Sequence, residues 1–198
     1  MAETLPTIYL ARHGETEWSL SGQHTGLSDI PLTPRGERNA RQLGTRLSGL
    51  TFPYVFTSPL KRARRTCELA GFGARAVVDP DLVEWDYGDY EGKTTAEIHR
   101  ARPDWELFRD GCPGAESVAD VGARADRVIA RLRALGSDAL VFSSGHFLRI
   151  LGARWCGLAP AAGKCFYLST AALSAVGYEH GLEEPVIRLW NDCRHVEA

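Results

Sequence analysis

The sequence lacks the features that mark secreted, membrane-spanning or zinc-binding proteins. Its five cysteines are an odd number and none stands in a C-x-x-C pair, so neither a disulfide framework nor a cysteine zinc site is predicted. No apolar run approaches the roughly 20 residues that cross a bilayer. The start, MAETLPTIYLARHGE, has no basic segment and no long apolar core, which argues against a secretory signal. We therefore expect a cytoplasmic protein with reduced thiols and no membrane partner.

An excess of charge of one sign is also missing. The chain has 23 basic and 25 acidic residues and a net charge of −2, so nothing favours nucleic acid as a partner. Repeats and low-complexity tracts are absent as well. A chain of 198 residues with 44% hydrophobic content can bury one core. We expect residues 1–198 to form a single domain.

Short apolar segments alternate with amphipathic segments along most of the chain. The apolar segments predict strands and the amphipathic ones predict helices, several of them with capping residues such as Thr33 before Pro34. We predict strands at residues 7–11, 54–58, 74–79, 139–144, 171–178 and 185–190. The alternation favours an α/β fold, a three-layer α/β/α sandwich around a mainly parallel sheet of about six strands.

Charged residues follow the predicted strands. Arg12 and His13 follow the first strand, Arg62 follows the second, and Glu84 follows the third after a short spacer. Ligands of open α/β sheets bind beyond the carboxyl ends of the strands. Arginine forks match phosphate oxygens, and a neutral histidine can attack phosphorus. The pattern therefore predicts a phosphate site.

Five sequence blocks resemble those of one known family. ARHGETEW is similar to the signature of the histidine phosphatase superfamily, the phosphoglycerate mutase-like branch. SPLKRARRT, LVEWDYGDYEG, CPGAES and GHFLR resemble its later blocks and occur in the family's order. The resemblance runs from Arg12 to Arg149. It is strongest to small bacterial acid phosphatases and fungal sedoheptulose bisphosphatase.

The resemblance implies roles for individual residues. His13 matches the nucleophile that forms a phosphohistidine, and Glu84 matches the general acid and base. Asp86 and Asp89 are competing carboxylates, but Glu84 stands three residues before Tyr87, as in the family's E-x-x-Y-G pattern. The matching phosphate clamp is Arg12 and Arg62, and the matching substrate-binding residues are Ser19, Gln23, Thr25, Gly26 and Tyr87.

The second histidine of the family has no simple counterpart. Alignment on Gly145 and on the Leu148-Arg149 pair places Ser144 at its position, and His146 follows two residues later. We expect His146 to serve the anion as a catalytic residue, with Ser144 as the alternative phosphate-binding group. Because a serine stands at the second-histidine position, a further alternative is that the chain is a weakly active or non-catalytic protein that binds phosphorylated ligands.

The leading hypothesis is a metal-independent phosphatase acting on a small phosphorylated metabolite, such as a sugar phosphate or bisphosphate. A phosphoglycerate mutase-type phosphomutase is the alternative enzyme. No cofactor is implied. His24, His99, His180 and His195 show no ligand spacing, so no metal site is predicted. A homodimer is compatible with the sequence.

Overall fold

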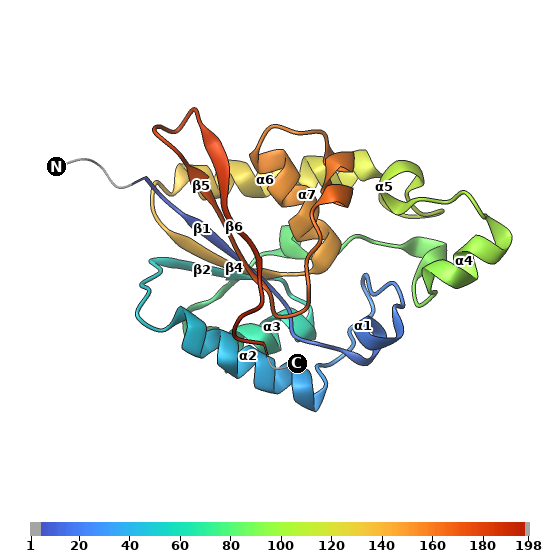
Figure 1. Cartoon of the computed structure of the whole chain (residues 1–198), viewed down its shortest axis with the longest axis horizontal. Coiled ribbons are helices and arrows are strands. Elements are labelled where there is room, and N and C mark those ends of the chain that lie inside the picture. Colours follow the sequence, from blue (N-terminus) through green and yellow to red (C-terminus); the bar gives the residue numbers. More distant parts are fainter. Residues whose placement is uncertain (1–4, 197–198) are drawn as a thin grey trace.

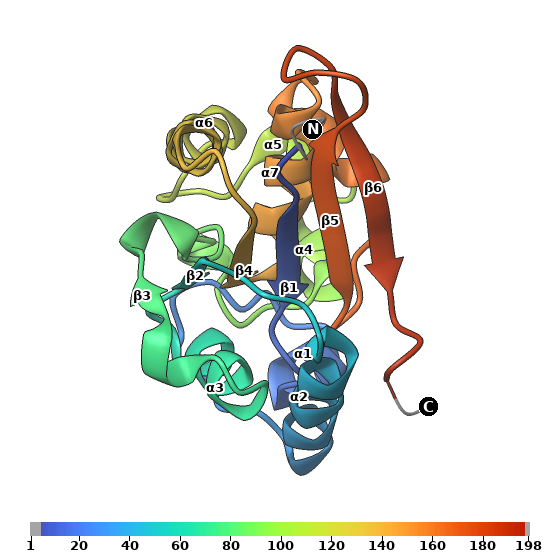
Figure 2. The same ribbon diagram turned by 90° about the vertical axis from the view of Figure 1, so that its left-hand side faces the viewer.

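A six-stranded sheet forms the centre of the computed structural model, which describes residues 5–196. The strands lie in the order β3-β2-β4-β1-β5-β6, as Figure 2 shows from left to right. Their bounds are Ile8–Arg12 for β1, Tyr54–Thr57 for β2, Val77–Val78 for β3, Ala139–Ser143 for β4, Leu173–Tyr178 for β5 and Pro185–Asp192 for β6. The predicted α/β architecture is confirmed.

The register of the parallel strands brings their carboxyl ends together. β1 and β4 run parallel with Arg12 opposite Ser143, and β2 runs parallel to β4 with Thr57 opposite Phe142. β5 and β6 are antiparallel and extend the sheet beyond β1. The segments that follow β1, β2 and β4 therefore leave the sheet at one edge, where ligands bind in this class of fold.

Helices cover both faces of the sheet and one end of it. In Figure 1, α2 and α3 lie below the sheet and α6 and α7 above it, whereas α1, α4 and α5 lie at the right-hand end. Alternate β4 residues join two separate cores, with Leu140 and Phe142 on the α2–α3 side and Ala139 and Val141 on the other. The bounds are Glu17–Ser21 for α1, Pro34–Leu47 for α2, Lys61–Leu69 for α3, Thr95–Ala101 for α4, Leu107–Asp110 for α5, Val118–Ala134 for α6 and Gly145–Trp155 for α7.

The predicted start of α2 agrees with the structure, because its capping residue lies next to the helix in the sequence. Thr33 caps α2 by accepting the Gly36 amide at 3.0 Å, and Pro34 is the first helical residue. The third strand differs, because Gly73–Arg75 forms a 3-10 turn and only Val77–Val78 pairs with β2. Further 3-10 turns are Pro80–Leu82, Gly88–Tyr90 and Pro160–Cys165. Within residues 5–196, no helix is long and apolar enough to cross a membrane.

Candidate active site

A pocket of about 260 Å³ opens beyond the carboxyl ends of the parallel strands. Its walls come from the loop after β1, from the segment that holds Glu84 and Tyr87, from α1, α4 and α7, and from the segment before β5. The site residues predicted from the sequence that line it are Arg12, His13, Ser19, Gln23, Thr25, Glu84, Tyr87 and His146. Residues far apart in the chain, from Arg12 to Leu168, therefore converge on one cavity.

His13 is held in one orientation with one ring nitrogen free. Its amide donates to the Ser143 carbonyl at 3.0 Å, which fixes it to the end of β4. Its Nδ1 lies 2.7 Å from the Gly14 carbonyl oxygen. A carbonyl can only accept, so Nδ1 carries the proton and Nε2 keeps its lone pair. Burial, together with the charges of Arg62 and Arg12, holds the pKa of His13 well below 6.5, so the ring is neutral and Nε2 can act as an acceptor or a nucleophile.

Two glycines let the loop after β1 approach α2 closely. A Cβ on Gly14 would lie 2.6 Å from the Gly36 carbonyl oxygen, and a Cβ on Gly36 would lie 2.2 Å from the Glu15 carbonyl oxygen. The Gly14 amide also donates to Thr66 Oγ1 at 2.9 Å. The backbone beside His13 is thus fixed by both α2 and α3.

Arg12 reaches the pocket along the backbone of the α7 start. A Cβ on Gly145 would lie 3.1 Å from Arg12 Cζ, so a glycine leaves room for the guanidinium. The guanidinium donates to the Leu168 carbonyl oxygen, and its buried Nε has no partner among the described residues. A buried donor without a partner is costly. An anion in the pocket would offer acceptors to this cation.

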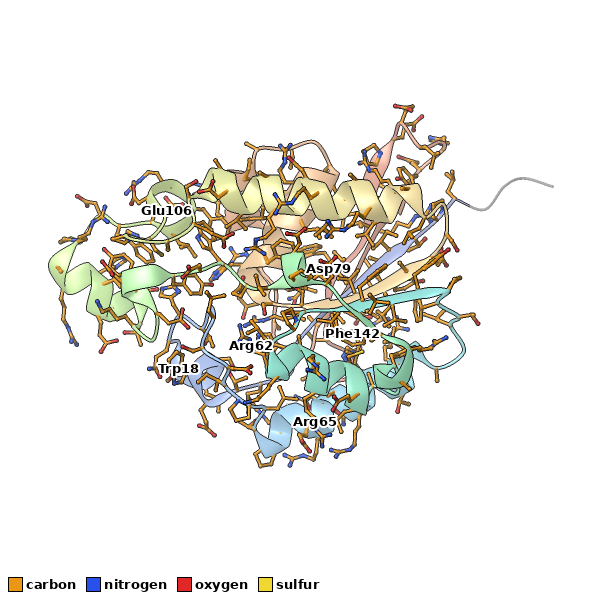
Figure 3. All side chains as sticks on the ribbon, turned by 180° about the vertical axis from the view of Figure 1, so that it is seen from behind. Trp18, Arg62, Arg65, Asp79, Glu106 and Phe142 are labelled. Atoms are coloured by element: carbon orange, nitrogen blue, oxygen red, sulfur yellow. The ribbon has the colours of Figure 1, made fainter. Side chains whose placement is uncertain are left out.

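Arg62 lies behind the pocket wall and does not line it. Its guanidinium donates to the carbonyl oxygens of Thr25 at 3.0 Å, Gly26 at 2.7 Å and Ser28 at 2.9 Å. Figure 3 shows it on the inner side of α3, in contrast to Arg65. The Gly26 amide donates to the Glu91 carboxylate at 2.9 Å. Arg62 and Gly26 therefore hold the loop that forms the wall.

The polar side chains of this loop already have partners. Ser19 forms a capping box with Thr16 at the start of α1. Gln23 donates to the Gly92 carbonyl at 2.8 Å and accepts from Ser21 Oγ at 2.6 Å. Thr25 Oγ1 donates to the Gln23 carbonyl at 3.1 Å. These side chains shape the pocket and stiffen its rim.

Glu84 lies at the N-terminus of α7, where its carboxylate accepts hydrogen bonds from backbone amides of the first helical turn. Its carboxylate accepts from the amides of Phe147 at 2.7 Å, His146 at 2.9 Å and Trp85 at 2.9 Å. Ser144 is the N-cap residue of α7, but its side chain makes no capping bond. The helix dipole favours a carboxylate at this position. Among the pocket-lining residues Glu84 is the one acid, whereas Asp86 and Asp89 lie outside the lining.

The structure separates the two candidates for the second-histidine role. His146 lines the pocket, and its Nδ1 is hydrogen-bonded to the Tyr87 hydroxyl. Burial, with the charge of Arg149, lowers the pKa of His146 well below 6.5. Ser144 is 0% exposed, does not line the pocket, and its Oγ has no partner in residues 5–196. His146, and not Ser144, therefore forms part of the wall.

Sequence reasoning left out seven residues of the lining. They are Trp18, Gly22, His24, Thr95, Gly145, Arg149 and Leu168. Trp18 is part of the block ARHGETEW and Arg149 is part of GHFLR, so the resemblance of these blocks to the family could have identified both as candidate site residues. His24 is adjacent to two predicted residues, and burial lowers its pKa to about 4. Leu168 lies in an irregular segment that carries no local signal of function.

A possible set of metal ligands lies elsewhere in the described part of the chain. Glu179, His180 and Glu184 place ligand atoms within 4.8 Å of one another. All three are exposed in the connection between β5 and β6, and none lines the pocket. The pocket itself offers phosphate ligands, namely arginine and imidazole groups, rather than a cluster of metal-binding carboxylates.

Comparison with known proteins identifies relatives over most of the chain. The model of the histidine phosphatase superfamily (branch 1) matches residues 8–193. An acid phosphatase from Mycobacterium tuberculosis is 42% identical over 181 residues, which cover 89% of each chain. Sedoheptulose 1,7-bisphosphatase from Saccharomyces cerevisiae is 41% identical over 191 residues, covering 80% of this chain and 70% of the yeast protein.

Solved structures show the same arrangement. The crystal structure of a Mycobacterium tuberculosis open reading frame product matches with a TM-score of 0.89 and 40% sequence identity. The match covers 94% of this chain and 97% of the mycobacterial one. The likeness thus extends over nearly the whole length of both chains.

Proposed function

The chain belongs to the histidine phosphatase superfamily and is a phosphoric monoester hydrolase, and from this premise we propose that it hydrolyses a small phosphomonoester, without a metal, through a phosphohistidine on His13. The observation that carries the proposal is the buried, neutral His13 with Nδ1 bonded to the Gly14 carbonyl and Nε2 free in the pocket. The relatives named acid phosphatase and sedoheptulose 1,7-bisphosphatase support a phosphorylated metabolite, including sugar phosphates.

In the first half-reaction, the lone pair of His13 Nε2 attacks phosphorus and the bond from phosphorus to the ester oxygen breaks. Arg12 stabilises negative charge on the phosphoryl oxygens. A phosphomonoester bound as its monoanion brings a proton, which Glu84 passes to the leaving oxygen, and that oxygen departs as an alcohol. The phosphorylated ring keeps its Nδ1 proton, and the Gly14 carbonyl stabilises the positive charge that results.

In the second half-reaction, water takes the place of the alcohol. The Glu84 carboxylate removes a proton from water as the water oxygen attacks phosphorus, and the bond from phosphorus to Nε2 breaks. Inorganic phosphate leaves, and His13 returns to its neutral form. The hydrogen bonds that Glu84 accepts from the amides of His146 and Phe147 keep its oxygens in a fixed place in both steps.

The test is turnover of p-nitrophenyl phosphate in the presence of EDTA, combined with trapping of the intermediate. We expect activity in chelator, and rapid quenching in alkali should reveal an acid-labile phosphate on His13. His13→Ala should lose at least about a thousandfold in kcat/KM, because it removes the nucleophile. It should also lose the trapped phosphate.

His180→Ala is the matched control, since His180 is exposed and outside the pocket. It should retain the activity and the trapped phosphate of the natural sequence. Full activity in His13→Ala, or loss of activity in EDTA, would overturn the proposal.

A further inference from the structure

The bridge segment, residues 167–172, lies against the end of β1 just before the chain enters β5. Its Ala171 amide donates to the His13 carbonyl at 2.9 Å. Its Leu168 carbonyl accepts from the Arg12 guanidinium. The bridge segment therefore contacts both the candidate nucleophile and the arginine beside it. The chemical steps proposed above assign no role to this segment.

The bond from Ala171 fixes the peptide group between His13 and Gly14. The N–H of that peptide group donates to Thr66 Oγ1 at 2.9 Å, and its carbonyl accepts from Ala171. The next carbonyl, that of Gly14, lies 2.7 Å from His13 Nδ1 and orients the ring. A rotation of the peptide group would move the Gly14 carbonyl and turn Nε2 within the pocket. The direction of Nε2 therefore depends on where Ala171 is held.

Ala171 occupies this place in a backbone conformation that alanine adopts rarely. Its φ is 57°, in the left-handed region, where the Cβ crowds the backbone. A residue keeps such a conformation only where its surroundings fix it. One fixing contact is the bond to His13. Others come from the end of β6 and from the tail that follows it.

The end of β6 is bonded to the bridge segment. β5 lies between β1 and β6 in the sheet (Figure 2). The Trp190 indole N–H donates to the Tyr167 carbonyl at 2.7 Å, and Asn191 Oδ1 accepts from the Ser169 amide at 2.7 Å. Asn191 has a φ of 55°, which asparagine tolerates better than most residues. The bridge segment thus links the last strand of the sheet to the end of β1.

His195 adds a contact to Ala171 itself. Its Nε2 lies 2.8 Å from the Ala171 carbonyl oxygen, so Nε2 carries a proton and donates it. The turn that brings His195 to this place begins at Asp192, which is buried and paired with Arg46 of α2 at 3.2 Å. Ala171 therefore accepts from the tail through its carbonyl and donates to His13 through its amide.

We propose that Asn191 and His195 are positioning residues for the attack of His13 on phosphorus. The inference rests on the phosphatase function proposed above. Neither side chain lines the pocket, so both act through the bridge segment and touch no reacting atom. They set the rate of phosphoryl transfer and leave the binding of phosphate to the residues of the pocket. A displacement of about 1 Å at a reacting group can slow a reaction about a hundredfold.

Asn191→Gly and His195→Ala test the inference. Asn191→Gly keeps the left-handed backbone and removes the acceptor, whereas His195→Ala removes the donor. Rapid quenching in alkali after mixing with p-nitrophenyl phosphate measures the rate constant for phosphorylation of His13. We expect each variant to lower this rate constant by about tenfold or more, with the Ki of inorganic phosphate within about twofold of the natural value.

Orthovanadate distinguishes positioning from a general loss of binding. It is a five-coordinate analogue of the transferring phosphoryl group when it bonds to the nucleophile, so its affinity depends on the direction of Nε2. The affinity of inorganic phosphate depends instead on the cations of the pocket. The Ki of vanadate should therefore rise in each variant by about the factor by which the phosphorylation rate constant falls.

His195→Gln and Asn191→Asp are the conservative variants. Glutamine can place an N–H donor near the position of Nε2, and aspartate keeps an oxygen acceptor and tolerates positive φ. Both should keep at least about a third of the natural rate constant, because the bond to the bridge segment is retained. His180→Ala is the matched control, since His180 is exposed in the turn at the other end of β6. It should change neither the rate constant nor the two Ki values.

A natural phosphorylation rate constant in a folded Asn191→Gly or His195→Ala protein refutes the role of that residue. Equal increases in the Ki of phosphate and of vanadate refute the inference as a whole. If one of the two variants fails to fold, the other decides. If neither folds, the contacts serve the fold and the inference is rejected. The proposed function fails separately, when the natural sequence forms no phosphate adduct on His13, and the positioning role is then rejected with it.

Discussion

At the scale of single residues, Ser144 and His146 differ in what surrounds them. They stand two positions apart, yet His146 reaches the pocket, whereas Ser144 is buried behind it and its hydroxyl has no hydrogen-bond partner within residues 5–196. The reason is that a helix begins at Gly145. Its first turn carries His146 toward Tyr87, whereas Ser144 still belongs to the extended backbone that leaves β4.

This difference makes a prediction for Ser144→Ala. We expect kcat/KM to stay within about twofold of the natural value, because the side chain does not line the pocket. The free energy of unfolding should be unchanged or higher by up to about 1 kcal/mol, because a buried hydroxyl without a partner is removed. Steady-state kinetics and urea unfolding would measure both quantities.

His146→Ala is the informative comparison and should lower kcat/KM by about 10-fold to 100-fold, through loss of a polar group in the wall. If Ser144→Ala instead caused the larger loss, the serine would serve the phosphate and the order of the two candidates would be reversed.

At the scale of elements, the site depends on how the loop after β1 packs against α2. Gly36 is in the first turn of α2, and its Cα faces the Glu15 backbone across a gap that admits no Cβ. Glu15 in turn accepts from Thr33 Oγ1 at 2.7 Å and is paired with Arg35. The position of His13 therefore follows from a helix start some 20 residues further along the chain.

Gly36→Ala should destabilise the protein despite the better helix propensity of alanine. On propensity alone the change would stabilise by about 1 kcal/mol. The clash with the Glu15 backbone should outweigh this and lower the free energy of unfolding by about 1–3 kcal/mol or more. Activity should also fall, because the backbone beside His13 must shift. Urea unfolding and p-nitrophenyl phosphate kinetics would measure the two effects.

Gly181→Ala provides the control for this change, because a Cβ at Gly181 meets nothing within 4 Å. Its stability and activity should match those of the natural sequence. A Gly36→Ala protein more stable than the natural one would show that α2 and the loop can move apart at little cost.

At the scale of the whole molecule, buried neutral histidines link stability to pH. Burial is the main cause that lowers the pKa of His13, His24, His146 and His195 from 6.5, and for His24 the value is about 4. Below pH 6.5 the unfolded chain binds protons that the folded chain does not. The stability present above pH 6.5 is therefore lost as pH falls, for His24 across the window from 6.5 to about 4.

We expect the free energy of unfolding to fall between pH 7.5 and pH 5.5, by at most about 1.4 kcal/mol per pH unit for each such histidine. Paired carboxylates add little in this range, since the ordinary pKa values of Asp81 and Glu15 are 3.8 and 4.5. Urea unfolding at pH 7.5, 6.5 and 5.5 measures the slope. His24→Gln should have a smaller slope, and a free energy that rises toward pH 5.5 would contradict the assignment.

Local patterns in the sequence were sufficient for much of the fold. The N-cap at Thr33 acts within one turn of α2, so it could be predicted and is confirmed. The third strand was predicted too long, because its pairing with β2 depends on a neighbour that the sequence does not show. The short helix α1 was missed because it lies in a polar loop without hydrophobic periodicity.

The sequence by itself determined the family, the fold class and the order of the blocks that follow the strands, because those depend on residue type and spacing. Only the tertiary structure decided which side chains reach the pocket. Arg62 is turned toward backbone carbonyls and Ser144 is enclosed, whereas Arg149 is brought into the wall. The physical reason is that the destination of a side chain depends on packing between elements far apart in the chain, and spacing along the sequence carries no record of that packing.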